Sequence, residues 1–233
     1  MTTRSDHRPY LTERLVNEYR ENGFLTLNGI CSLYEIRSWQ EECRRLWDSV
    51  SIGDDNPRIR WRDRVDSGRV ADRIDAVLEI SSVFAKLSHD DRFVRAAADV
   101  LGGDPDVYTA TLLSRWPGTT GNPLQQGYPD WSFVHDIPFD DVVNVLIPID
   151  PFDAASGALE VIPGYQRHVV DGPPGAPLDE SQVNTSRGAV LVLSPGDVAL
   201  IHGLSLHRSG PNRTAKRRES LLVTYVRPGG DDR

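Results

Sequence analysis

The sequence predicts a single, mainly β domain with α-helices at its N-terminal end, and three observations support this. At 233 residues the chain is long enough for one large core but short for two. Up to about residue 103, apolar residues recur mostly at helical spacing. From Val107 onward, the apolar runs are short, rich in β-branched residues and separated by Pro, Gly and Asp. Short strands with frequent turns are typical of a sandwich or a barrel.

The helical half has clear start and stop signals. Helices are expected over residues 10–22, 33–47 and about 91–101, with a short strand at Phe24–Leu27. Ser32 and Glu35 form a capping-box pattern that opens the second helix, and Gly102 ends the third. Cys31 and Cys43 lack CxxC spacing, so we expect them to be free buried thiols.

In the second half, six runs are expected to form strands, at residues 107–116, 144–149, 158–162, 189–193, 197–201 and 220–226. Residues 165–187, rich in Pro, Gly, Asp and Ser, interrupt this series. A connection of this length is uncommon inside a compact domain unless it forms a lid or is disordered. We expect a lid.

The overall charge limits the classes of partner. The formal net charge is −8, which argues against binding to nucleic acid. No apolar run approaches the length needed to span a membrane, and the first residues lack the apolar core of a signal peptide. We therefore expect a cytoplasmic protein with no membrane partner.

Arginines alternate with other residues at positions 58, 60, 62 and 64. In a strand, this spacing would place all four on one face. The favoured interpretation is a solvated edge, because charge runs are mostly solvated. The alternative is an anion-binding lip for a phosphate or carboxylate of the substrate. Acidic neighbours at Asp63, Asp66 and Asp72 weaken the alternative.

The stretch from His207 to Arg218 carries the strongest chemical pattern. Turn residues 210–212 favour an antiparallel hairpin, with Arg218 returning on the strand next to His207. His207 and Ser209 would share a face, because strand side chains alternate. One metal ligand and two groups suited to a carboxylate would then converge. The alternative is a surface turn with an incidental basic cluster.

The spacing of His207, Ser209 and Arg218 resembles the C-terminal signature of the phytanoyl-CoA dioxygenase-like family. Segments 144–150, 157–164 and 195–197 resemble other parts of that family, in the same order. The resemblance implies a double-stranded β-helix over residues 104–233, with residues 1–103 packed on it as part of the same domain. It also implies that His207 binds iron(II), and that Ser209 and Arg218 hold the distal carboxylate of 2-oxoglutarate. Asn144 is a further expected cofactor contact.

The family's first two metal ligands form a His-x-Asp motif on an earlier strand. The favoured alignment places Asp130 at the acidic position and Tyr128 where histidine is usual. A rival alignment uses His135, but the residue two further on is Ile137, which is not an acid. Three outcomes stay open: Tyr128 ligates as a phenolate, His135 completes the triad, or metal is weakly held or absent. Three aromatic residues are candidates for the substrate wall: Trp116, Trp131 and Phe133.

The resemblance implies an iron(II)/2-oxoglutarate-dependent oxygenase that hydroxylates or desaturates a small molecule, as a monomer or homodimer. An acid at position 130 argues against halogenation. One alternative keeps the fold and uses Tyr128 and Asp130 as acid and base in a non-oxidative cyclisation or isomerisation. Another is a binding protein with a degenerate site.

Overall fold

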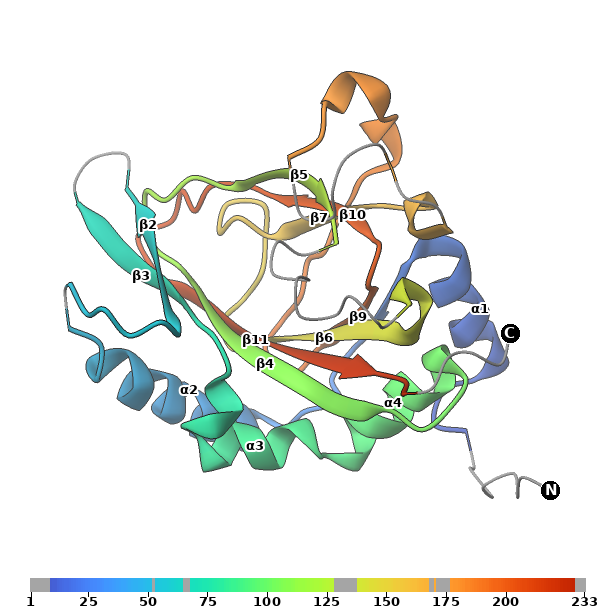
Figure 1. Ribbon diagram of the computed structural model, residues 1–233, viewed down its shortest axis with the longest axis horizontal. Coiled ribbons are helices and arrows are strands. Elements are labelled where there is room, and N and C mark those ends of the chain that lie inside the picture. The colour runs from blue at the N-terminus through green and yellow to red at the C-terminus, as the bar shows by residue number, and fades with distance from the viewer. Residues whose placement is uncertain are drawn as a thin grey trace.

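Two antiparallel sheets form the body of the protein. The computed structural model describes residues 9–51, 53–64, 68–127, 138–167, 170 and 177–228. One sheet has seven strands in the order β1-β9-β6-β11-β4-β3-β2, and the other has four in the order β5-β10-β7-β8 (Figure 1). An apolar cluster that includes Leu146 and Leu222 of the large sheet and Val161 of the small one lies between them. The predicted double-stranded β-helix is thereby confirmed.

The strands of the large sheet are β1 Phe24–Leu27, β2 Ile59–Asp63, β3 Arg69–Ile74, β4 Asp106–Arg115, β6 Val142–Pro148, β9 Val198–His202 and β11 Arg218–Val226. Those of the small sheet are β5 Asn122–Gln126, β7 Leu159–Ile162, β8 Ala189–Val190 and β10 Leu206–Ser209. The helices are α1 Glu13–Asn22, α2 Leu33–Asp48, α3 Ser82–Ser88 and α4 Asp91–Leu101. Short 3₁₀ turns are η1 Val77–Glu79, η3 Phe139–Asp141, η4 Tyr165–Arg167, η5 Glu180–Gln182 and η6 Thr185–Arg187.

The N-terminal helices cover the outer face of the large sheet (Figure 1). The Ser32–Glu35 capping box opens α2 as predicted, and Gly102 ends α4 at a φ of 74°. The three expected helices and the strand Phe24–Leu27 are confirmed. Strands β3 and β5 are not among the strands predicted from the sequence. Both cysteines are buried free thiols, as expected. No helix in the described part of the chain has the length and apolarity to cross a bilayer.

The central strands of the large sheet have two different faces. On β11, Leu221, Val223 and Tyr225 point into the core shared with the helices, and each is fully buried. The alternate residues of β11 line a cavity between the sheets: Arg218, Ser220, Leu222 and Thr224. Burying one large apolar side chain contributes about 1.5–3 kcal/mol, so the helix-side face supplies much of the stability. The other face is left available for polar groups.

The predicted hairpin between β10 and β11 is wrong. β10 pairs with β5 and β7 in the small sheet, whereas β11 pairs with β4 and β6 in the large one. Residues 210–217 therefore cross from one sheet to the other. The Asn212 side chain donates to the carbonyls of Arg115 and Lys216, at 2.7 and 2.8 Å, and this holds a wide connection in place of a tight turn. Residues on facing sheets still converge on the space between them.

The described part of the predicted lid is packed. Leu178 and Val183 join a small apolar cluster with Leu124 and Leu206. The Tyr165 hydroxyl accepts a hydrogen bond from the backbone of Asn184 at 3.0 Å. Residues 168, 169 and 171–176 lie outside the described residues. A lid function for residues 165–187 stays a prediction.

Candidate active site

A cavity of about 690 Å³ lies between the two sheets. Its size is within the range of small-molecule sites, roughly 300–1,000 Å³. Four residues predicted from the sequence to bind the metal or the cosubstrate line it: Asn144, His207, Ser209 and Arg218. They come from β6, β10 and β11, so both sheets contribute. These side chains converge as predicted, but they do so because two sheets face each other and not because β10 and β11 form a hairpin.

His207 is held in one tautomer. Its side chain is buried on β10, and Nδ1 donates to the Ser205 carbonyl at 2.9 Å. Burial lowers the pKa of His207, so its imidazole is neutral at physiological pH. Nε2 is then the unprotonated nitrogen, and the Gln125 side-chain amide lies 3.2 Å from it. A neutral imidazole with one nitrogen tied to a backbone carbonyl is the usual arrangement of a metal-ligating histidine.

Two neighbouring donors fix the hydrogen-bonding role of the Ser209 hydroxyl. Its Oγ accepts hydrogen bonds from Arg115 Nη2 at 3.2 Å and from the Asn122 backbone at 3.0 Å. A hydroxyl oxygen has two lone pairs, so both acceptor positions are occupied. The O–H can then act only as a donor. Because Ser209 lines the cavity, its O–H is suited to bind an acceptor there.

Arg218 is a buried cation with an unused donor. Its guanidinium stacks over the Phe152 ring, 3.8 Å from the centroid, and its Nε–H has no hydrogen-bond partner among the described residues. Burial, then the neighbouring charge of Arg115, lowers the pKa of Arg218 to about 9, with Asp150 and Asp153 partly offsetting. The group still carries its charge at neutral pH. A buried donor without a partner costs roughly 1–3 kcal/mol, which an acceptor in the cavity would recover.

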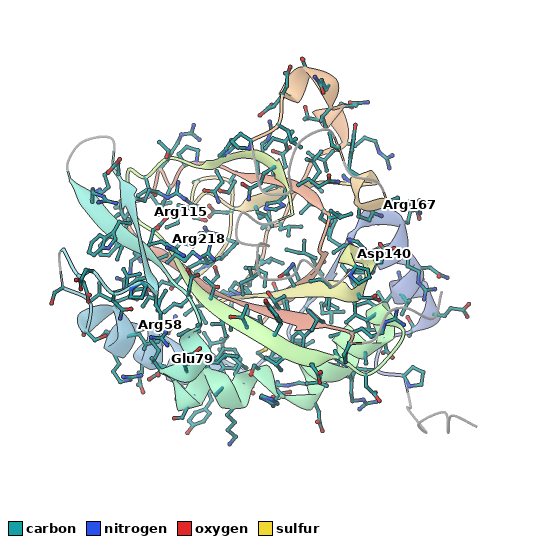
Figure 2. The ribbon with its side chains drawn as sticks, in the orientation of Figure 1. Arg58, Glu79, Arg115, Asp140, Arg167 and Arg218 are labelled. Carbon is teal, nitrogen blue, oxygen red and sulfur yellow. The ribbon has the colours of Figure 1, made fainter. Side chains whose placement is uncertain are left out.

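Arg115 lines the cavity but was not among the site residues predicted from the sequence. It lies directly opposite Arg218 in the β4–β11 register, and Figure 2 shows the two side chains close together in the interior. Among the described residues, its side chain donates hydrogen bonds to neutral oxygens, those of Thr120 and Ser209. Burial, then Arg62, lowers the pKa of Arg115 to about 10. The available signal was strand alternation, because Arg115 shares a face of β4 with Leu113, which also lines the cavity.

Of two further residues predicted to lie at the site, Asn144 lines the cavity and Trp116 does not. Asn144 is buried in the cavity wall, where its Oδ1 accepts from the Thr224 hydroxyl at 2.8 Å. Its Nδ2 has no partner among the described residues. Trp116 lies outside the lining: its Nε1 donates to the Ala71 carbonyl at 2.8 Å, and Arg217 stacks on its ring. Trp116 follows the last residue of β4, and it is Arg115 that faces inward.

Several predicted residues lie outside the described part of the chain. These are Tyr128, Asp130, Trp131, Phe133 and His135. Within the described residues, no three His, Cys, Asp or Glu side chains gather closely enough to hold a metal ion. The assignment of the ligands that would accompany His207 therefore stays a prediction.

The expectation that four arginines share one face is wrong. The β2–β3 register shifts between Arg60 and Trp61. Arg60 and Arg62 line the cavity, but Arg58 forms an ion pair with Glu79 at the helix layer (Figure 2). The extra residue of this shift is Asp72 on β3, so β2 itself is not interrupted. Arg58 precedes β2, which begins at Ile59, so the strand alternation does not extend to it.

The fold and the cavity define a jelly-roll protein with a cavity between its two sheets that is lined by the buried arginines Arg115 and Arg218. The chain belongs to the phytanoyl-CoA dioxygenase (PhyH) family, whose model matches residues 19–220. It is 22% identical to a methylphosphonate hydroxylase of Gimesia maris, covering 92% of this chain and 80% of that protein. It is 24% identical to an ectoine dioxygenase of Streptomyces anulatus, covering 89% and 75%. The crystal structure of EctD from S. alaskensis with 2-oxoglutarate and 5-hydroxyectoine has a similar fold, with a TM-score of 0.78, 20% identity and coverage of 97% and 78%.

Proposed function

We propose that the protein is an iron(II)/2-oxoglutarate-dependent oxygenase that acts on a small molecule. The observation that carries this proposal is the pair of unused donors in one buried cavity, Arg218 Nε–H and Ser209 O–H. They lie in the same cavity as His207. Family membership and the names of the related dioxygenases support the same conclusion.

The residues present fit the distal carboxylate of the cosubstrate. A carboxylate accepts hydrogen bonds at two oxygens and binds a guanidinium strongly. Arg218 and Ser209 would hold it, and Arg115 would fix the Ser209 hydroxyl. Phe152 under the guanidinium keeps this end apolar and strengthens each of these contacts by excluding water. Asn144 Nδ2 offers a further donor elsewhere in the cavity.

The neutral His207 imidazole fits one position of a two-histidine, one-carboxylate iron site. Asp130 is the proposed acidic ligand, with Tyr128 or His135 as the third. When bound, iron with 2-oxoglutarate supplies the oxidising power for hydroxylation or desaturation. The chain's own residues would hold the cosubstrate, orient the substrate and exclude water. We also propose a cytoplasmic location, which the two free thiols support, and a monomer or homodimer without nucleic-acid or membrane partners.

The test is succinate production with iron(II), 2-oxoglutarate and oxygen over a panel of small organic acids and zwitterions. His207→Ala should remove iron(II) binding, measured anaerobically by calorimetry, and His89→Ala is the matched control because His89 ends α3 at the surface. Iron-loaded protein that never consumes 2-oxoglutarate would contradict the proposal. Activity that survives a chelator and the absence of oxygen would select the non-oxidative alternative.

A further inference from the structure

The cavity has a second charged region on β2 and β3. Arg60, Arg62 and Arg73, which we call the β2–β3 lip, all line it. Arg73 lies opposite Leu113 of β4, so the lip runs alongside the strand that ends at Arg115. The Arg60 side chain is 53% exposed, which places it at the rim, whereas the Arg62 side chain is 27% exposed. The lip therefore extends from solvent toward the buried arginines.

The described cavity lining has a surplus of positive charge. It contains five guanidiniums and two carboxylates, Asp63 and Asp72, in a protein whose net charge is −8. Arg62 is matched by Asp72. Arg60 and Arg73 both bind the single carboxylate of Asp75. Concentrated charge of one sign in a concave site attracts ligands of the opposite sign and is costly to maintain without them.

Two of the lip guanidiniums, those of Arg60 and Arg62, are anchored by acids and keep unused donors among the described residues. Among the described residues, Arg60 uses only its Nε–H, toward Asp75. Arg62 uses Nε toward Asp72 and Nη2 toward Asn122 Oδ1 at 2.8 Å. A guanidinium has five N–H donors, so part of the fork remains uncommitted in both Arg60 and Arg62. Acids that anchor an arginine through one edge preorganise the other edge for an anion.

We infer that the β2–β3 lip binds an anionic group of the substrate, such as a phosphonate, a phosphate ester or a carboxylate. This rests on the proposed function, in which Arg218 and Ser209 take the distal carboxylate of 2-oxoglutarate and leave the lip to a second anion. The cavity is large for a five-carbon diacid alone, so a substrate fits beside the cosubstrate. The anion sits at the lip, and the rest of the substrate extends into the cavity.

The experiment compares two small probes of similar shape, methylphosphonate as the anion and methanesulfonamide as the neutral molecule. Binding to metal-free protein is measured by calorimetry, with and without saturating 2-oxoglutarate. The variants are Arg60→Gln and Arg62→Gln. Arg69→Gln is the control, because Arg69 lies on the same hairpin, is paired with Asp63 and does not line the described cavity. Melting temperatures verify that every variant is folded.

We expect methylphosphonate to bind in the presence of 2-oxoglutarate and methanesulfonamide to bind at least about tenfold more weakly. Arg60→Gln and Arg62→Gln should each weaken methylphosphonate about tenfold, with Arg69→Gln within about twofold of wild type. Equal binding of the two probes, or equal effects of Arg60→Gln and Arg69→Gln, would overturn the inference. Separate titrations of 2-oxoglutarate distinguish the two proposals. If 2-oxoglutarate fails to bind, the oxygenase proposal is contradicted. If 2-oxoglutarate binds normally but the affinity for methylphosphonate does not depend on Arg60 and Arg62, only the proposal for the lip is contradicted.

Discussion

Neighbouring residues on β11 serve opposite faces of one sheet, and the two faces are built by different rules. Toward the helices, Leu221, Val223 and Tyr225 pack in a dense apolar core. Toward the small sheet, Arg218 and Thr224 line a cavity, and Arg218 has a buried donor without a partner in the described residues. The helix-side face lowers the free energy of the folded chain. The cavity-side face raises the free energy of the folded chain, because it keeps a buried charge and an unused donor for binding. This is expected where function and stability compete.

The largest expected effect comes from Arg218→Gln. It removes the cation proposed for the cosubstrate, so 2-oxoglutarate should bind about a hundredfold more weakly. The ligand-free protein should be as stable as wild type or more stable, because an unmatched buried charge is lost. Calorimetry and thermal unfolding measure the two effects.

Arg208→Gln is the control for Arg218→Gln. Arg208 lies on β10 of the small sheet, next to Ser209, but its side chain is paired with Glu160 and Glu180. We expect normal 2-oxoglutarate binding and, at most, a slight loss of stability. If Arg218→Gln instead lowered the melting temperature strongly, Arg218 would belong with the stabilising face, and the contrast between the faces would fail.

The next effect tests Arg115 as a positioning residue that acts through Ser209. Arg115→Met should weaken 2-oxoglutarate about tenfold, and Arg115→Lys should recover part of the loss by restoring the charge. Ser209→Ala should cost less in the Arg115→Met background than in wild type, because the two residues share one hydrogen bond. Additive effects in this double-mutant cycle would show that Arg115 does not position Ser209.

The same two faces explain what the sequence predicted and what it did not. Alternation along a strand and helix signals are local, so the helices, strand Phe24–Leu27 and the shared face of His207 and Ser209 followed from the sequence. Which sheet a strand joins is set by long-range pairing. The turn residues 210–212 favoured a hairpin, but the strands on either side of them joined different sheets.

The site was predicted best where the resemblance supplied a motif. His207, Ser209, Arg218 and Asn144 all line the cavity. Arg115 had no motif, and its role depends on lying across from Arg218, a pairing more than a hundred residues apart in sequence. Trp116 was chosen as an aromatic residue flanking the expected pocket, yet its ring packs against Arg217. Residue type predicts chemistry less well than strand face does.

A pH effect is expected from Glu219, which precedes Ser220 on β11 and contacts α2. Arg217 Nη2 lies 2.6 Å from Glu219 Oε1, at an angle unsuited to a hydrogen bond. Burial raises the pKa of Glu219 from 4.5 to about 7, with the Arg217 charge opposing and that of Asp150 adding to it. The folded state therefore holds this proton more tightly than the unfolded state does. Stability is lost as pH rises from about 4.5 through about 7.

Glu219→Gln should remove most of that loss. Between pH 5 and pH 8 the free energy of unfolding should fall by roughly 1–3 kcal/mol less in the variant than in wild type. Chemical unfolding of both proteins at both pH values measures this difference. Some slope remains, because burial also raises the pKa of Asp150. A parallel pH dependence in variant and wild type would show that Glu219 is not the responsible group. Binding of 2-oxoglutarate should not change, since the Glu219 side chain is on the helix side.

The smallest effect is the sharpest test of the separation between the faces. The Tyr225 hydroxyl is buried and donates to the Ser88 carbonyl at 2.7 Å, joining β11 to the end of α3. Tyr225→Phe keeps the ring and removes this bond, so unfolding should become easier by about 1 kcal/mol. The affinity for 2-oxoglutarate should stay within about twofold of wild type, because sites that share no partners contribute independently. If the affinity fell together with the stability, strain on the helix face would be reaching Arg218 through the strand, and the two faces would have to be treated as one coupled unit.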